Sequence, residues 1–143
     1  KRLTFHQHML HGFMTAVREA GIAYEIPDTL DLDSPADMIR DYVRRRSGEP
    51  DPPDGFACPG EVSALATITG MSDQGLTLGA EYDIVAKQTS LLLSQIQPKV
   101  ETIYEDLKAA GEAMGQLLLQ RIAGEPVEDL TILQSPQFSF PTP

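Results

Sequence analysis

The sequence predicts an α/β fold with three layers, in which helices cover both faces of a parallel sheet. Segments with the helical spacing of apolar residues alternate along the chain with short segments rich in strand-forming residues. The order helix, strand, helix, strand, helix, strand favours a parallel sheet, because the chain must cross over between parallel strands and usually does so as a helix. The 143 residues suffice for one domain with a hydrophobic core.

The N-terminal part of the chain predicts two helices around one strand. Residues 4–20 carry apolar side chains at spacings of three and four, and Gly21 is a typical helix stop. Residues 22–26, Ile-Ala-Tyr-Glu-Ile, predict a strand. Ser34 is a good N-cap, and Pro35 suits the first position of a second helix. The inner face of that helix is expected to consist of Met38, Ile39, Tyr42 and Val43.

Two further strands flank a third helix. Residues 55–58 predict a short strand that a Pro-Gly turn ends, and residues 82–86, Tyr-Asp-Ile-Val-Ala, predict another. Residues 61–71 between them predict a helix. Its inner face is expected to consist of Val62, Leu65, Ala66 and Thr69. Three consecutive leucines, residues 91–93, follow in an otherwise polar connection.

The C-terminal part predicts the longest helix, over residues 104–123. A short strand over residues 100–103 is expected before it, and Gly124 ends it. Residues 130–133 form a candidate last strand. The apolar stripe of the helix is expected to consist of Tyr104, Leu107, Gly111, Met114, Leu118 and Ile122.

The charge of the chain argues against binding to nucleic acids. The net charge is −10 and the pI about 4.6, and so acidic a surface repels phosphate backbones. No apolar run of the roughly eighteen residues needed to span a membrane is visible. The single Cys58 cannot form an internal disulfide, which fits a reducing cytoplasm, and we interpret it as a small buried hydrophobe. No signal peptide is visible either, but the true N-terminus is expected upstream because the chain opens within a predicted helix.

Three stretches of the chain carry motifs in a fixed order. The first is His-Gly-Phe at residues 11–13 with Gly-Ile at 21–22, the second is PDGFACPGEVSALA at 53–66, and the third spans residues 101–126. The most specific stretch is GQLLLQRIAGEPVE at 115–128. Together they resemble the LacI/GalR family of transcriptional regulators. The resemblance implies a two-lobed fold of the periplasmic-binding-protein-like type I, with a ligand between the lobes beyond the carboxyl ends of the strands.

The resemblance also implies that the chain holds only part of such a protein. Residues 1–103 would form the C-terminal lobe of an effector-binding domain without its first strand. Residues 104–143 would form a crossover helix and a tail, and the helix is expected to pack on the absent first lobe or on a partner chain. A headpiece that binds operator DNA is also expected upstream, outside this chain.

The effector contacts of the family fall on changed residues here. The family's arginine before the Gly-Phe pair becomes Met9, which we interpret as packing at the edge of the cleft. The Asn-Asp turn becomes Gly-Glu at residues 60–61. The Gly-x-Asp-Asp run becomes Ala-Lys-Gln-Thr at residues 86–89, where Lys87 and Gln88 are the preferred effector contacts.

Each candidate contact has an ordinary structural alternative. Lys87 at a strand end suits an anionic group such as a sugar acid or phosphate, or is simply solvated. Glu61 could bind hydroxyls or stabilise the first turn of a helix. Gly60 could admit a ligand to backbone N–H groups or form a plain turn. His8 and Asp33 are the remaining candidate effector contacts. The alternative for His8 is a solvent-exposed side chain, and the alternative for Asp33 is helix capping.

No metal, cofactor or catalytic site is predicted. His6 and His8 lie on different sides of the expected helix, so the three early histidines do not form one ligand face. The four aspartates between residues 28 and 37 lack the spacing and glycine of a calcium loop. No Ser–His–acid or Cys–His arrangement and no phosphate-binding glycine loop is visible.

The favoured function is that of a cytoplasmic effector sensor. It would bind a sugar or sugar acid in an interlobe cleft and thereby control DNA binding by the absent headpiece. It would act as a homodimer, because exposed leucines require a covering surface. No membrane partner is expected. The predicted dimer surface consists of Val62, Leu65, Leu91 and Leu92. The alternative is a periplasmic sugar-binding protein of a transporter, and a small α/β enzyme is less favoured because no catalytic arrangement is visible.

Overall fold

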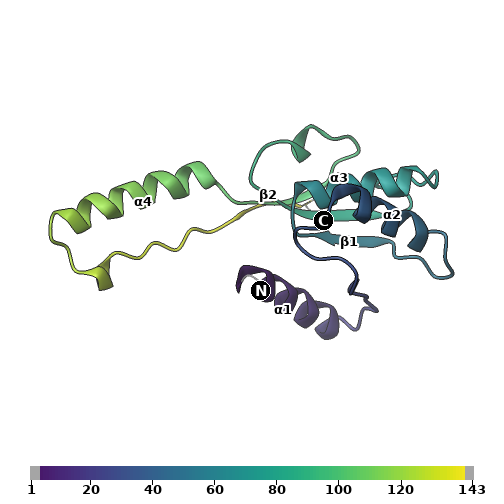
Figure 1. Cartoon of the computed structure of the whole chain (residues 1–143), viewed down its shortest axis with the longest axis horizontal. Helices are drawn as coiled ribbons and strands as arrows, with labels where there is room; N and C mark the ends of the chain where they lie inside the picture. Colours follow the sequence, from purple (N-terminus) through teal and green to yellow (C-terminus); the bar gives the residue numbers. More distant parts are fainter. Residues whose placement is uncertain (1–3, 141–143) are drawn as a thin grey trace.

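The structure is a computed structural model that describes residues 4–140 (Figure 1). It contains a four-stranded sheet with the strand order β1-β2-β3-β4. The α-helices are α1 (Thr4–Glu19), α2 (Ala36–Arg46), α3 (Glu61–Ser72) and α4 (Leu107–Ile122), the strands are β1 (Gly55–Cys58), β2 (Asp83–Gln88), β3 (Glu101–Tyr104) and β4 (Gln137–Ser139), and the 3-10 turns are η1 (Leu93–Gln95) and η2 (Val127–Asp129).

The sheet is parallel except for its last strand. β1 and β2 run parallel with Ala57 beside Val85, and β2 and β3 run parallel with Lys87 beside Ile103. β4 pairs antiparallel with β3. The predicted α/β class is therefore confirmed, together with the strands at residues 55–58, 82–86 and 100–103 to within two residues at each end. The sequence did not predict β4.

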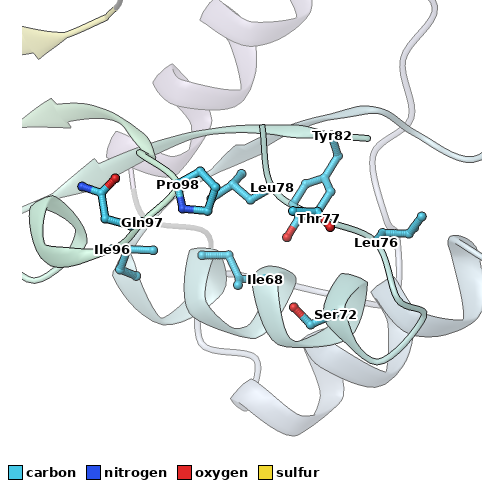
Figure 2. A pocket seen from close by; sticks show the side chains of 9 residues that line it. All are labelled: Ile68, Ser72, Leu76, Thr77, Leu78, Tyr82, Ile96, Gln97 and Pro98. Carbon is cyan, nitrogen blue, oxygen red and sulfur yellow. The ribbon is translucent and has the colours of Figure 1, made fainter. Parts of the chain in front are cut away.

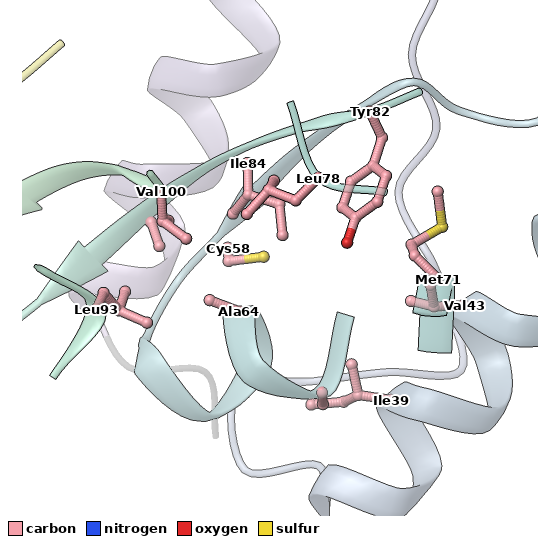
Figure 3. Packing of buried hydrophobic residues seen from close by; sticks show 12 residues of the cluster. Ile39, Val43, Cys58, Ala64, Met71, Leu78, Tyr82, Ile84, Leu93 and Val100 are labelled. Atoms are coloured by element: carbon pink, nitrogen blue, oxygen red, sulfur yellow. The ribbon is translucent and has the colours of Figure 1, made fainter. Parts of the chain in front are cut away.

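The hydrophobic core lies between α3 and the sheet (Figure 3). α3 packs on β1 and β2, and α2 packs on the outside of α3. The largest fully buried side chains are Met71, Ile84, Leu93 and Val100. Of the three consecutive leucines only Leu93 enters the core, while Leu91 and Leu92 remain exposed.

Gly70 allows α2 and α3 to approach each other closely. A Cβ atom at Gly70 would lie 2.7 Å from the carbonyl oxygen of Arg40 and 3.1 Å from the Cβ of Val43. Arg40 also forms an ion pair with Asp73, just beyond the end of α3, at 2.7 Å. The two helices therefore form one unit, of which only α3 contacts the sheet extensively.

The inner faces of α2 and α3 differ from the predicted ones. Ile39 and Val43 are buried, but the prediction for Met38 was wrong, since that side chain is 48% exposed. In α3 the predictions for Val62 and Thr69 were wrong, because both are exposed. The buried residues of α3 are Ala64, Ala66, Thr67, Gly70 and Met71. They surround much of the helix because it is covered by the sheet on one side and by α2 on the other.

The strand predicted at residues 22–26 does not form. Within the described residues no strand pairs with it, and Ile22, Tyr24 and Ile26 are exposed. An extended segment becomes a strand only when a neighbouring strand supplies hydrogen-bond partners, so strand propensity alone is not sufficient. The helix before it forms as predicted, but α1 lies apart from the sheet with only slight contact to it (Figure 1).

α4 and the segment that returns from it extend away from the sheet (Figure 1). None of the residues of α4 is buried, although Met114, Leu118 and Ile122 of the predicted stripe are large and apolar. The candidate strand at residues 130–133 is irregular rather than β. We call residues 105–136 the arm. In the part of the chain that the structure describes, no helix has the length and apolar character required to cross a membrane.

Candidate functional site

The carboxyl ends of β1, β2 and β3 lie at one edge of the sheet, which we call the carboxyl edge. The three strands are parallel and end at Cys58, Gln88 and Tyr104. The loops that follow them carry polar side chains, and α3 begins here. Four predicted effector contacts lie at this edge: Gly60, Glu61, Lys87 and Gln88.

Glu61 joins the start of α3 to the connection after β2. Its Oε1 accepts hydrogen bonds from the backbone N–H of Thr89 at 3.3 Å, from the N–H of Ser90 at 2.9 Å and from the Ser90 hydroxyl at 2.7 Å. Burial on its own raises the pKa of the Glu61 carboxyl, but the bonds from Ser90 and Thr89 outweigh it, so the pKa is lowered. The carboxylate is thus engaged within the chain, with its charge at a helix N-terminus.

Gly60 is the N-cap residue of α3. Its N–H donates to the Ser63 hydroxyl at 3.2 Å, and that hydroxyl donates to the Gly60 carbonyl at 2.8 Å. Its backbone is extended, with φ −168°, so the conformation does not require glycine. No atom lies within 4 Å of the position that a Cβ would take, so the space beside Gly60 is open.

Lys87 forms an ion pair that the sequence did not reveal. Its Nζ lies 2.9 Å from Oε2 of Glu105, the first residue after β3. The Glu105 N–H also donates to the carbonyl of Gln88 at 3.0 Å, so backbone and side chain both attach Glu105 to the end of β2. Residue 105 could have been found from the register, because it follows the strand that runs beside Lys87.

Gln88 is a buried polar side chain at the carboxyl edge. It is 4% exposed, and its Nε2 donates to the Thr102 hydroxyl at 3.1 Å. Its Oε1 is buried and has no hydrogen-bond partner among the described residues. A buried unpaired acceptor is costly, so a donor on a ligand or a water at this position would stabilise it.

The remaining predicted contacts do not reach the carboxyl edge. His8 and Met9 lie on α1, which makes only slight contact with the sheet. Asp33 lies in a turn before α2, where its N–H donates to Oδ1 of Asp31 at 3.0 Å.

Cys58 is a buried thiol beside the hydroxyl of Thr67, with 3.7 Å between Sγ and Oγ1. Burial raises the pKa of this thiol to about 11, which keeps it protonated and unreactive at neutral pH. The prediction of a small buried hydrophobe is confirmed. Among the side chains that the structure describes, no group of three or more His, Cys, Asp and Glu is arranged to hold a metal ion.

The predicted dimer residues lie on α3 and on the connection after β2, two segments that the Glu61 hydrogen bonds join. The bonds from Ser90 to Glu61 bring Leu91 and Val62, which follow these two residues, to the same part of the surface. Val62 is 60% exposed and Leu91 is 64% exposed. Leu92 is also exposed and Leu65 is half-buried.

The sequence matches the family described as periplasmic binding protein-like domain over residues 1–139. The HTH-type transcriptional repressor PurR of Aliivibrio salmonicida (strain LFI1238) is 24% identical over 113 residues, which cover 79% of this chain and 34% of the repressor. The chain thus spans about a third of the length of this curated relative.

Solved structures share the fold. A regulatory protein of the LacI family from Chloroflexus aggregans superposes with a TM-score of 0.78 at 20% identity, covering 90% of this chain and 47% of that one. A LacI family transcriptional regulator from Arthrobacter sp. FB24, in complex with lactose, gives a TM-score of 0.74 at 15% identity, covering 89% of this chain and 48% of that one. The resemblance to the LacI/GalR family is confirmed.

Proposed function

The chain belongs to the family of periplasmic binding protein-like domains, and on that premise we propose that it forms one lobe of the effector-binding domain of a LacI-type transcriptional regulator. The similarity to a PurR repressor supports regulation rather than transport or catalysis. Because the chain spans 34% of that repressor, the remaining lobe and the DNA-binding headpiece are assigned to the longer protein. With its net charge of −10, this chain is not the part that contacts DNA.

The observation that carries the proposal is the polar group at the carboxyl edge. In open α/β sheets, ligands bind beyond the carboxyl ends of the strands. Here that edge holds the unpaired buried Oε1 of Gln88, the Lys87–Glu105 ion pair and the open space beside Gly60. We assign the effector to this edge, with Gln88 as the principal contact from this lobe.

The effector class that we propose is a hydroxylated small molecule, a sugar or a sugar acid. A hydroxyl can donate to Gln88 Oε1, which an apolar ligand cannot do. The Arthrobacter regulator that shares the fold was solved with lactose. His8, Met9 and Asp33 would line this site only if α1 and the loop after it approach the sheet more closely in the longer protein.

The arm is assigned to the other lobe. Residues 105–136 leave the sheet and return to it as β4, and their apolar residues, including Met114 and Leu118, are exposed within the described chain. A helix with a large uncovered apolar stripe requires a partner surface. In the longer protein we therefore expect residues 1–103 to form one lobe and the arm to cross to the next.

A thermal-shift screen of the full-length protein against neutral sugars and sugar acids tests the proposal. A ligand present at about 100 times its Kd adds about 2.7 kcal/mol to the free energy of unfolding, which raises the Tm. The Gln88→Leu variant should lose most of that rise, because its unpaired acceptor is gone. Gln95→Leu, an exposed glutamine in η1, is the matched control and should respond like the unmodified protein. If no sugar or sugar acid raises the Tm, the proposed effector class is wrong.

A further inference from the structure

A pocket of about 190 Å³ lies at the opposite end of β2 from the carboxyl edge (Figure 2). We call it the Tyr82 pocket. Tyr82 directly precedes β2, whereas Gln88 ends it, and six steps along a strand correspond to about 20 Å. The pocket is therefore separate from the proposed effector site. Its walls are α3, the loop before β2 and the segment before β3, from which Ile68, Leu76, Leu78, Ile96 and Pro98 contribute apolar side chains.

The Tyr82 hydroxyl is an unpaired polar group in this wall. Tyr82 is 2% exposed, and its Oη is buried without a hydrogen-bond partner among the described residues. Figure 2 shows the ring reaching from the start of β2 toward α3, among the residues that line the pocket. In the unfolded chain this hydroxyl forms hydrogen bonds with water, and in the folded chain no bond within residues 4–140 replaces them, which is unfavourable.

The ring cannot turn its hydroxyl to solvent without losing its packing. It stands edge-on to Phe56 of β1, with ring centroids 5.9 Å apart and an interplanar angle of 88°. Turning the ring toward solvent would break this edge-to-face contact, which is a favourable arrangement of two aromatic rings. Burial also raises the pKa of Tyr82, so the hydroxyl keeps its proton and acts as a donor at neutral pH.

We propose that the Tyr82 pocket is a second ligand site, which takes a small, mostly apolar molecule with one hydrogen-bond acceptor for the Tyr82 hydroxyl. The size fits a single substituted ring, since a cavity of about 150 Å³ with apolar walls can take benzene. The acceptor follows from the unpaired donor, and the apolar body follows from the aliphatic walls. The hydroxyls of Ser72 and Thr77 and the amide of Gln97 give the pocket its polar lining.

The test is NMR of full-length protein with labelled isoleucine methyl groups, titrated with two probes of the same shape. Cyclohexanone carries a carbonyl acceptor, and methylenecyclohexane replaces that oxygen with carbon. Both should shift the methyl signals of Ile68 and Ile96, and cyclohexanone should bind about threefold to tenfold more tightly, the usual worth of one neutral hydrogen bond.

Two variants isolate the hydroxyl and the pocket. Tyr82→Phe should remove the preference for cyclohexanone while it keeps the weaker binding of methylenecyclohexane, and Tyr104→Phe, at the carboxyl edge, should change neither. Ser72→Leu, at the exposed end of α3, should fill the pocket and abolish both sets of shifts.

Three results would overturn the proposal. The first is that neither probe moves the Ile68 and Ile96 signals. The second is that Tyr82→Phe binds both probes like the unmodified protein, which would mean that the hydroxyl pairs only with water. The third is that these signals depend on protein concentration and not on the probes, which would make the pocket part of a contact between two copies. None of these results bears on sugar binding at the carboxyl edge.

Discussion

At the scale of single residues, the charged groups of the carboxyl edge are already engaged within the chain. Glu61 accepts three hydrogen bonds from Thr89 and Ser90, and Lys87 pairs with Glu105. From the sequence, Lys87 is a predicted contact for an anionic effector. Since a carboxylate lies 2.9 Å from its ammonium group, an anion would have to compete with Glu105 for this lysine.

Glu105→Gln should therefore increase the affinity of the full-length protein for sugar acids relative to the matching neutral sugars. The substitution removes a carboxylate that competes with an anionic ligand for the Lys87 ammonium group. Titration calorimetry at two salt concentrations measures the change, which should shrink as salt screens the charge. Glu112→Gln, from the exposed Lys108–Glu112 pair on α4, removes the same charge elsewhere and should have no effect. An unchanged ratio of affinities would mean that Lys87 does not face the effector.

The Cys58 thiol predicts a dependence of stability on alkaline pH. Its pKa is about 11 in the folded chain, against an ordinary value of 9.0. Since the folded state holds this proton more tightly, the stabilisation is complete below pH 9 and is lost as the pH rises through 11. At roughly 1.4 kcal/mol per pKa unit, the thiol contributes at most about 2–3 kcal/mol to the free energy of unfolding. Urea unfolding from pH 8 to 11 should show a steeper fall for the unmodified protein than for Cys58→Ala, and equal slopes would contradict the buried thiol.

At the scale of elements, the paired helices α2 and α3 depend on a glycine. Gly70→Ala places a methyl group 2.7 Å from the Arg40 carbonyl oxygen, so the helices must separate. We expect a loss of about 1–3 kcal/mol in the free energy of unfolding, the usual cost of overpacking, measured by urea titration. Gly48→Ala is the control, because its new Cβ would make only an ordinary 3.5 Å contact with Arg45 and should cost far less. Similar losses in both variants would contradict the close contact.

Whereas α2 and α3 pack on each other, the segment at residues 22–26 has no neighbouring strand with which to pair in the described chain. Its residues favour a strand, yet the structure leaves them irregular. β1 is the edge strand of the sheet and pairs with β2 on one side only. A strand from another part of the longer protein, placed beside β1, would offer a partner both to β1 and to residues 22–26.

At the scale of the whole molecule, two exposed apolar surfaces require covering partners that the described residues do not supply. The arm presents one such surface and the neighbourhood of Val62 and Leu91 presents another. Monomeric proteins rarely leave large contiguous apolar patches exposed. We assign the arm to the other lobe of the same protein and the surface at Val62 and Leu91 to a second copy.

Leu92→Asp should convert the proposed dimer into a monomer, because it would place a charge in the apolar centre of the contact. Light scattering should give the mass of two copies for the unmodified full-length protein and the mass of one copy for the variant. Leu133→Asp is the control, since Leu133 is exposed on the arm and not in the predicted dimer surface. A two-copy mass that persists in Leu92→Asp, or a one-copy mass for the unmodified protein, would contradict the proposed dimer surface.

The sequence by itself determined the α/β class, the four helices and the three parallel strands, because periodicity and helix caps act over a few residues. The resemblance to the LacI/GalR family pointed to Gly60, Glu61, Lys87 and Gln88 as effector contacts, and the structure places all four at the carboxyl edge. Only the tertiary structure decided that residues 22–26 lack a partner and that β4 pairs with β3. It alone revealed the Lys87–Glu105 pair and the unpaired hydroxyl of Tyr82. Each of these depends on contacts between segments distant in sequence, which local patterns do not encode.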